Sequence, residues 1–480
     1  MRRFLVYDSL TREVRTFAPI NPPRVGMFVC GLTPYAEAHI GHGRFALVFD
    51  LVARALRRWG YRVFYVQNVT NLDDKLIARA AEEGVEPLAL AERHFTAYRA
   101  AMERLGVRTV NYYPFATDYL AEIIAQIQAL VDRGYAYRSD DGSVYYSVAK
   151  FPDYGKLSGQ KAEALRPGAR LEVDPRKRAP EDFVIWKAAT PGEPSWESPW
   201  GPGRPGWHIE DTAITERLLG ARYDLHGAGI DLVFPHHEAE IALAEAATGK
   251  VPLVNYWMHA GMLRFAGEKM SKSLGNIVAL EEVLDRWGPG PVRFFFVNAQ
   301  HRSPLEFDAE TSLTEATEAY RRLRQPLDRI EEILARDGPD RPGAEAPAAL
   351  GSEADGLVER LDTTLANDFD TRGSVAALFV WSRSLLEKPE LLETLNGPAL
   401  ERLRAPYLWA REVLGLFEDG MPSPAGAWGP VVETALAARA RARARGDFAE
   451  ADRIRDDLAK AGITLEDGAG RTRWKAARGG

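Results

Sequence analysis

The sequence predicts an α/β fold built on a parallel sheet, followed by a helical bundle and a small C-terminal α+β domain. Two observations predict the sheet. Apolar runs at 25–30 and 62–67 have the character of buried strands, and over 41–59 apolar residues recur at helical spacing. Two strands joined by a helix pair in parallel through a right-handed crossover. Such sheets bind ligands at the carboxyl ends of their strands, so we expect functional residues from Cys30 and from Asn68 onward.

The elements that follow alternate between helical and stranded patterns. Helical segments continue to about Gly134, and shorter strands follow to about Pro202. The α/β pattern returns between 220 and 262, where Asp231–Phe234 is predicted to end a strand. This order predicts an insertion between two halves of one sheet.

Residue spacing and turn residues predict the bundle and the C-terminal domain. The helical pattern extends to 418, and a Pro-, Gly- and Ala-rich stretch at 337–356 predicts a mobile loop between two helices. Residues 418–424 predict a linker. Beyond it, an apolar stripe over 448–461 predicts a helix, and 463–474 predict a small hairpin.

The composition is that of a soluble, multidomain enzyme of the cytoplasm. The 480 residues are 46% hydrophobic and 27% charged, enough to build a large core. With 61 basic and 68 acidic side chains the net charge is −7, which excludes a basic coat over the whole surface but not a local basic patch. The single cysteine, Cys30, excludes an intrachain disulfide. No apolar run is long enough for a signal peptide or a membrane span.

A histidine pair follows the first predicted strand. His39 and His42 are three residues apart near the start of the predicted helix, where both imidazoles can reach one anion. The backbone N–H groups and the dipole of a helix N-terminus favour phosphate. Gly41 leaves space for a flat base to lie against the backbone. Such a pair alone is more often a surface or core feature than a site.

A cationic cluster lies far along the chain from this pair. Lys269 and Lys272 are set among glycines and serines, as in a mobile loop that clamps a polyphosphate. Such a clamp stabilises the charge that develops on a leaving pyrophosphate. The alternative for this cluster alone is a solvated loop. No Walker-type GxxxxGK[ST] motif is present as a rival ATP site.

Together the two motifs resemble the HIGH and KMSKS signatures of class I aminoacyl-tRNA synthetases. Longer motifs are similar to the cysteinyl-tRNA synthetase family, and they are Phe28–Gly31, Asn68–Lys75, Gly206–Glu210, Asp231–Glu238, Trp257–Met262, Arg302–Leu305 and Gly446–Asp456. The resemblance spans essentially the whole chain and implies a Rossmann-type catalytic domain with an insertion. The segments it implies are the first half of the catalytic domain (1–115), a connective insertion (116–202), the second half with the metal site (203–265), the KMSKS loop and stem-contact region (266–307), the helical bundle (308–418) and the anticodon-binding domain (419–480).

The resemblance also implies the residues that bind ATP, with Mg²⁺ as its companion ion. They are His39, Gly41 and His42 in the first motif and Lys269, Met270, Ser271, Lys272 and Ser273 in the second. The two histidines and the two lysines would be catalytic.

In that family an active-site zinc ion, held by two cysteines, a histidine and a glutamate, binds the thiolate of the substrate cysteine. Matched by motif, the ligands here are Cys30, Asp211, His236 and Glu240, with aspartate where the family has cysteine. His236 and Glu240 are four residues apart and so share one face of a helical turn. A carboxylate replaces a thiolate without a change in charge, and aspartate is an accepted zinc ligand, so we expect zinc to bind. The alternative is that Asp211 caps a helix and that the site holds no metal.

The resemblance assigns further residues to the amino acid and to tRNA. Thr70, Trp207 and Asp231 would form the amino-acid pocket, with Asp231 paired to the substrate ammonium. The C-terminal region resembles the part that reads the anticodon, where Trp474 is a candidate for stacking on a base. The alternating arginines over 439–445 would spread around a helix rather than form one stripe, so RNA contact and a solvated helix both remain open.

The resemblance implies a cytoplasmic, monomeric member of the cysteinyl-tRNA synthetase family, which would use L-cysteine, ATP and tRNA(Cys) and have no membrane partner. Two alternatives remain open at this point. One is a related ligase that hands activated cysteine to an amino sugar, as in mycothiol synthesis, although that ligase resembles only the front of the chain. The other is a non-catalytic tRNA-binding paralogue, which would have no use for an adenylate site.

Overall fold

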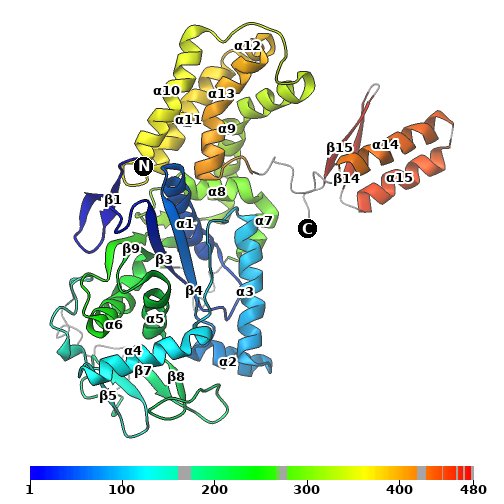
Figure 1. The fold of residues 1–480 in the computed structure, drawn as a ribbon. Helices are drawn as coiled ribbons and strands as arrows, with labels where there is room; N and C mark the ends of the chain where they lie inside the picture. The colour runs from blue at the N-terminus through cyan, green and yellow to red at the C-terminus, as the bar shows by residue number, and fades with distance from the viewer. Residues whose placement is uncertain are drawn as a thin grey trace. The chain divides into compact units, whose positions relative to one another are not determined.

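The computed structural model describes residues 1–160, 174–265, 268–269, 278–418, 429–445, 447–460, 463–468 and 471–476 (Figure 1). The chain forms two compact units, Met1–Asp419 and Gly420–Gly480.

A four-stranded parallel sheet organises the first unit, in the order β10–β9–β3–β4. Its strands are β3 (Arg24–Leu32), β4 (Arg62–Val69), β9 (Tyr223–Gly229) and β10 (Val254–Ala260). Residues 27–30 of β3 are at most 3% exposed, because a central strand of a covered parallel sheet is buried on both faces. Helix α1 (Ile40–Arg58) joins β3 to β4 and lies beside them in Figure 1. The predicted parallel pairing of these two strands through a helix and the α/β fold class are confirmed.

A buried carboxylate fixes α1 in place. Asp50 is fully buried and accepts hydrogen bonds from Arg293 Nη2 at 2.6 Å and Arg54 Nε at 2.8 Å. It also accepts from the Thr109 hydroxyl at 2.9 Å. Burial by itself raises the pKa of Asp50, but the two guanidinium groups outweigh burial and lower it. Because an unpaired buried charge costs about 3–5 kcal/mol, this contact ties α1 firmly to α8 (Pro289–Val297), which carries Arg293.

An antiparallel sheet precedes β9 in the chain, in the order β5–β6–β7–β8. Its strands are β5 (Ala136–Arg138), β6 (Val144–Tyr146), β7 (Phe183–Ala188) and β8 (Gly203–Pro205). Strand β8 leads directly into α5 (Trp207–Leu219) through Gly206. A Cβ atom on Gly206 would lie 2.3 Å from the carbonyl oxygen of Val184, so only glycine lets α5 begin this close to β7. The antiparallel sheet therefore sets the position of α5.

The first unit has further elements, among them two small sheets, β1–β2 and β12–β11–β13. They are β1 (Leu5–Asp8), β2 (Glu13–Thr16), α2 (Asp74–Glu83), α3 (Pro87–Arg104), η1 (Ala116–Tyr119), α4 (Leu120–Asp132), η2 (Val148–Lys150), β11 (Leu263–Phe265), β12 (Glu268–Lys269), α7 (Leu280–Trp287) and β13 (Leu305–Glu306). The prediction of helices up to about Gly134 is confirmed by α2, α3 and α4.

The chain leaves β9 earlier than predicted. The strand ends at Gly229, Ile230–Leu232 form a 3₁₀ turn (η4), and Val233–His237 form a π-helical turn (η5) that leads into α6 (Glu238–Thr248). The prediction that Asp231–Phe234 ends a strand is therefore wrong. The apolar, β-branched character of this run suggested a strand, but the run follows the carboxyl edge of the sheet, where the chain must turn toward α6.

A helical bundle completes the first unit. It comprises α9 (Ala309–Asp337), α10 (Ala348–Leu365), α11 (Thr371–Leu386), α12 (Pro389–Thr394), α13 (Gly397–Trp409) and the π-helical turn η7 (Ala410–Leu414). The predicted loop at 337–356 is wrong over 348–356, because α10 begins at Ala348. Ala354, Leu357 and Leu361 are buried at helical spacing, and this packing outweighs the low helix propensity of the glycines nearby.

The second unit pairs two helices with a hairpin. Helices α14 (Gly429–Ala444) and α15 (Phe448–Lys460) pack on each other, and β14 (Ile463–Gly468) pairs antiparallel with β15 (Arg471–Ala476). The predicted helix and hairpin are confirmed. On α15, Ala451 and Leu458 are buried as the stripe predicts, but Phe448 is 63% exposed. Among the residues that the structure describes, no helix has the length and apolar character to span a membrane.

Candidate active site

The four predicted metal ligands meet at the carboxyl edge of the parallel sheet. Cys30 lies near the end of β3, Asp211 on α5, His236 on η5 and Glu240 on the first turn of α6, and each is at most 3% exposed. One donor atom from each lies within 4.8 Å of the others. His236 Nε2 is 3.1 Å from Asp211 Oδ2 and 3.2 Å from Glu240 Oε1. Cys30 Sγ is 3.7 Å from Asp211 Oδ2. The four residues come from three separate segments, since His236 and Glu240 are four residues apart on η5 and α6, and the fold brings the segments together.

Asp211 does not cap a helix. Helix α5 begins at Trp207, and its N-cap is Gly206. The carboxylate of Asp211 instead accepts a hydrogen bond from the side-chain amide of Asn68, at the end of β4. Asn68 Oδ1 accepts in turn from the N–H of Gly31 at 2.5 Å. These bonds hold Asp211 directly beside β3, which removes the helix-cap alternative.

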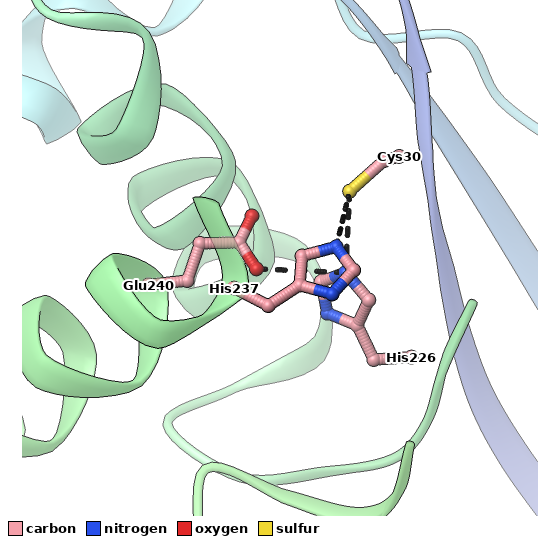
Figure 2. Close-up of side chains that lie close together, drawn as sticks. All are labelled: Cys30, His226, His237 and Glu240. Carbon is pink, nitrogen blue, oxygen red and sulfur yellow. Dashed lines mark hydrogen bonds and ion pairs between the residues drawn. The ribbon is translucent and has the colours of Figure 1, made fainter. Parts of the chain in front are cut away.

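Two histidines that the sequence analysis missed complete a second group around Cys30. His226 Nε2 and His237 Nε2 lie 3.3 and 3.2 Å from Cys30 Sγ, and His226 Nε2 is 3.5 Å from Glu240 Oε2 (Figure 2). Figure 2 shows the sulfur directed at both imidazoles, with the Glu240 carboxylate beside them. A signal for His226 existed, because a polar residue inside the buried run of β9 needs a partner.

The imidazoles are oriented by hydrogen bonds on their far sides. Each of three rings uses Nδ1 for a neighbour and turns Nε2 toward the cluster. The pairs are His236 with His208 Nδ1 at 2.7 Å, His226 with the Tyr223 hydroxyl at 2.7 Å, and His237 with His259 Nε2 at 2.9 Å. Metal-binding imidazoles in proteins are oriented in this way.

The charges of the cluster favour a cation. Burial, followed by Glu240 and Asp211, raises the pKa of the Cys30 thiol, and burial followed by Asp211 raises the pKa of Glu240. Both carboxylate oxygens of Glu240 are buried and accept no hydrogen bond from any described residue. A thiol, two carboxylates and imidazoles whose Nε2 atoms face the cluster form a donor set for a divalent ion such as zinc. The residues present therefore fit the metal that the sequence predicts.

The histidine pair of the first motif lines a cavity of about 340 Å³ next to this cluster. His39, Gly41 and His42 contribute to its wall, together with Asp231 and with Gly31, the neighbour of Cys30. His39 is the N-cap of α1, and the His39 and His42 rings stack with centroids 3.7 Å apart. The cavity is large enough for a small ligand, and the N-terminal turn of α1 in its wall favours anions.

His42 is a neutral hydrogen-bond donor. Its Nδ1 accepts a hydrogen bond from the backbone N–H of His39 at 3.1 Å. Burial, with the neighbouring His39, lowers the pKa of His42 to about 3. The neutral ring therefore carries its proton on Nε2 and can donate it without a charge of its own.

Of the three predicted amino-acid residues, Trp207 contacts the cluster and Asp231 lines the cavity. Trp207 stacks on His236 with centroids 3.9 Å apart and planes within 2°, and it keeps 41% of its surface exposed. Thr70 is buried and accepts from Asn68 Nδ2 at 3.4 Å. Asp231 lies in the η4 turn rather than in a strand, and it lines the cavity.

Part of the second motif lies outside the described residues. The structure does not describe Met270, Ser271, Lys272 and Ser273. Of Lys269 it describes the backbone, which pairs with Arg264 of β11. Trp474 lies on β15 opposite Leu465. The roles of these residues stay predictions.

Two family models match the chain. Residues 16–318 match the class I (C) tRNA synthetase catalytic domain, and residues 427–474 match the cysteinyl-tRNA ligase anticodon binding domain.

Curated relatives match along almost the whole length. A cysteine–tRNA ligase of Methylococcus capsulatus is 45% identical over 478 residues, which cover 98% of this chain and 99% of that protein. A cysteine–tRNA ligase of Alkalilimnicola ehrlichii is 45% identical with the same coverage.

Solved structures share the fold at low identity. Methionyl-tRNA synthetase of Mycobacterium tuberculosis, in complex with methionyl-adenylate, superposes with a TM-score of 0.61 at 18% identity. The superposition covers 82% of this chain and 92% of the chain of that structure. A LeuRS ternary complex from Agrobacterium radiobacter gives a TM-score of 0.60 at 10% identity, with 83% and 85% covered. These similarities show a class I synthetase fold.

We expect the stability cost of replacing His42 with glutamine to shrink on acidification. The unfolded chain binds a proton at His42 below its ordinary pKa of 6.5, whereas the folded chain does so only near 3. Stability that is present above pH 6.5 is therefore lost as the pH falls. Between pH 7.5 and 5 the original chain should lose about 2 kcal/mol on this account, and H42Q should lose none. Urea unfolding of both ligand-free proteins at the two pH values measures the change, and an unchanged difference would contradict it.

Proposed function

The chain belongs to the cysteine–tRNA ligase family of class I aminoacyl-tRNA synthetases, and we propose that the buried cluster and the histidine-lined cavity divide its reaction between them. The reaction joins L-cysteine to ATP as cysteinyl-adenylate with release of pyrophosphate, and then transfers the cysteinyl group to the 3′ end of tRNA(Cys). One observation carries the division of labour. Cys30 belongs to the cluster and Gly31 lines the cavity, so the side-chain and carboxylate ends of one small amino acid can occupy both at once.

We propose that Cys30, Asp211, His236 and Glu240 hold a zinc ion. When bound there, zinc supplies a soft Lewis acid that favours a thiolate over a hydroxyl. This matters because a steric pocket separates near-isosteres such as cysteine and serine by only about 10- to 200-fold. The protein's own part is to keep the donors in place through Asn68 and His208. Cys30, His226, His237 and Glu240 form the competing ligand set.

Three residues are proposed to hold the amino acid. Asp231 pairs with the substrate ammonium, because its carboxylate lines the cavity one turn beyond β9. Thr70 and Trp207 form the wall between ammonium and side chain, since Trp207 is fixed by stacking on His236. These roles are proposed for the three residues in the positions that the structure gives them.

ATP is proposed to lie across the N-terminal turn of α1. Neutral His42 donates a hydrogen bond to a phosphate oxygen, and so does His39, while Gly41 leaves room for the nucleotide. Lys269 and Lys272 close on the phosphates from the second motif, with Mg²⁺ bound to the nucleotide. Because charge on the leaving pyrophosphate grows in the transition state, the lysines stabilise that state more than bound ATP.

The second unit is proposed to bind the anticodon of tRNA(Cys). Its match to an anticodon binding domain supports this role, and Trp474 on β15 is the candidate for stacking on a base. The cytoplasmic location and the monomeric state stay predictions.

The amino-sugar ligase and the non-catalytic paralogue are not favoured. The curated relatives that match over 98% of the chain carry the name cysteine–tRNA ligase, and the anticodon domain is matched as well.

Pyrophosphate exchange across a panel of amino acids, followed by charging of tRNA, tests the function. We expect exchange with cysteine alone, and transfer to tRNA(Cys). Exchange without transfer would support the amino-sugar ligase, and no exchange with any amino acid would support the paralogue.

Substitution of Asp211 tests the metal site. Asp211→Cys should hold zinc more tightly and keep cysteine as the preferred substrate, because sulfur donates more charge than oxygen. Asp211→Ala should weaken zinc binding by more than the loss of about 10- to 100-fold that follows removal of a residue that only orients a metal ligand, and should lose cysteine activation with it. Elemental analysis after dialysis against a chelator measures retention.

Asp224→Asn is the matched control for the metal test. Asp224 is a buried aspartate at the other end of β9 that accepts from the N–H groups of Ile20 and Gly26. Its variant should retain zinc. Well under one zinc per chain in the original protein, with cysteine activation intact, would overturn the proposal. Loss of zinc in variants of His226 or His237, but not of His236, would favour the competing ligand set.

Replacement of Lys272 with alanine should slow adenylate formation far more than it weakens cysteine binding. The expected loss is about 10²–10³-fold in the rate of the chemical step, as for other groups that stabilise developing charge. Single-turnover adenylate formation and equilibrium cysteine binding separate the two effects. An equal loss in both would show that Lys272 is only a binding group.

A further inference from the structure

The loop between α10 and α11 contains two consecutive residues in the left-handed region. Asp368 and Phe369 both have φ of +54° although neither is glycine. Both side chains are buried, at 8% and 3% exposed. Left-handed backbone in a bulky residue such as Phe369 persists only where the surroundings enforce it, and such outliers cluster at functional sites. The contacts of Asp368 show what holds the backbone of this loop in that conformation.

Asp368 joins three separate segments of the first unit. Its Oδ1 accepts a hydrogen bond from the N–H of Tyr7 at 2.7 Å, and its own N–H donates to the carbonyl of Leu5 at 3.1 Å. Its Oδ2 accepts from Arg302 Nε at 2.9 Å and lies 2.7 Å from Arg302 Nη2. The Arg302 guanidinium also lies over the Tyr7 ring, 4.4 Å from its centroid. Arg302 is therefore held from two sides.

Arg302 belongs to a short segment that lies against the wall of the nucleotide cavity. The carbonyl of His301 accepts from the N–H of Gly261 at 2.8 Å. A Cβ atom on Gly261 would lie 2.2 Å from the carbonyl oxygen of Ser303, so the two backbones are in direct contact. Gly261 itself lines the cavity. A displacement of Arg302 would therefore displace Gly261 as well, because their segments are in contact through the backbone and not through a flexible side chain.

Arg44 of α1 connects the same segment to the histidine motif. Its Nη2 donates to the carbonyl of Ser303 at 2.5 Å, and its Nη1 donates to the carbonyl of Met262 at 2.8 Å. Arg44 and Met262 both line the cavity, and Arg44 follows His42 by two residues. The segment His301–Ser303 therefore supports both sides of the cavity.

We propose that Asp368 is a positioning residue for ATP. It acts through Arg302, which fixes His301–Ser303 and thereby the spacing between Arg44 and Gly261 across the cavity. The helical bundle thus contributes to nucleotide binding without touching the nucleotide. The donors around Cys30, which would hold the side chain of cysteine, have supports of their own in Asn68 and His208. The inference rests on the proposed function, because it assigns ATP to this cavity.

Asp368→Asn is the informative variant. Asparagine tolerates the left-handed region and can still accept from the N–H of Tyr7, but it loses the charge that holds Arg302. We expect kcat/KM for ATP in cysteine-dependent pyrophosphate exchange to fall about tenfold, equivalent to about 1.4 kcal/mol. The KM for cysteine and the thermal midpoint should stay near those of the original protein. Arg302→Lys, which keeps the charge but loses the two-point contact, should have the same ATP-specific effect.

Asp355→Asn is the matched control. Asp355 also lies in the bundle and pairs with Arg402 at 2.5 Å, but this pair is exposed and joins α10 to α13 only. Its variant should leave both substrates unaffected. The double variant D368N with R302K should be no worse than either single variant, because both remove one contact.

Three results would overturn the inference. The first is that the kinetic constants of D368N equal those of D355N. The second is that kcat/KM falls equally for ATP and for cysteine while the thermal midpoint also falls. The third is that the losses in kcat/KM for ATP add up in the double variant. If D368N does not fold, R302K alone decides between an ATP-specific and a general loss. Absence of cysteine-dependent exchange in the original protein would instead refute the proposed function, and the two failures are thus distinguishable.

Discussion

The parallel pairing of β3 between β4 and β9 is the constraint on which the rest of the structure depends. It places the carboxyl ends of three strands at one edge, so Cys30, Asn68 and His226 come from distant parts of the chain to within one small volume. The backbone then turns away from this edge into α1, and through η4 and η5 into α6. The cluster and the cavity are two consequences of the same edge.

Buried polar groups hold that edge against the rest of the unit. Asp50 fixes the middle of α1 through Arg293 and Thr109, while Arg44 fixes its beginning to the segment at 301–303. Each contact is largely shielded from water, where an unpaired partner is costly, so the histidine motif has little freedom to shift. The cluster around Cys30 differs in kind. Its neighbours are thiol, carboxylate and imidazole, and this donor set is suited to a cation rather than to an arginine.

The sequence around Asp211 did not distinguish between a helix cap and a metal ligand. Its neighbours in sequence, Trp207 to Glu210, make it look like a residue near a helix start, and a cap was a fair alternative. The fold instead turns its carboxylate toward Asn68 and His236. The antiparallel sheet decides this, because the close approach of Gly206 to β7 sets where α5 begins.

The sequence by itself determined the fold class, the two motifs and the four clustered donors. The fold class depends on features that are local or nearly so, namely apolar period and turn residues. The roles of the two motifs and the four donors follow instead from the resemblance to the cysteinyl-tRNA synthetase family. The sequence could not find His226 and His237 as a group, the true end of β9, or the start of α10. It also gave no sign that Asp368 reaches Arg302. These depend on which segments meet in space, and a contact such as that of Asp368, on a loop of the bundle, with Arg302, beside the nucleotide cavity, leaves no periodicity in the chain for sequence analysis to detect.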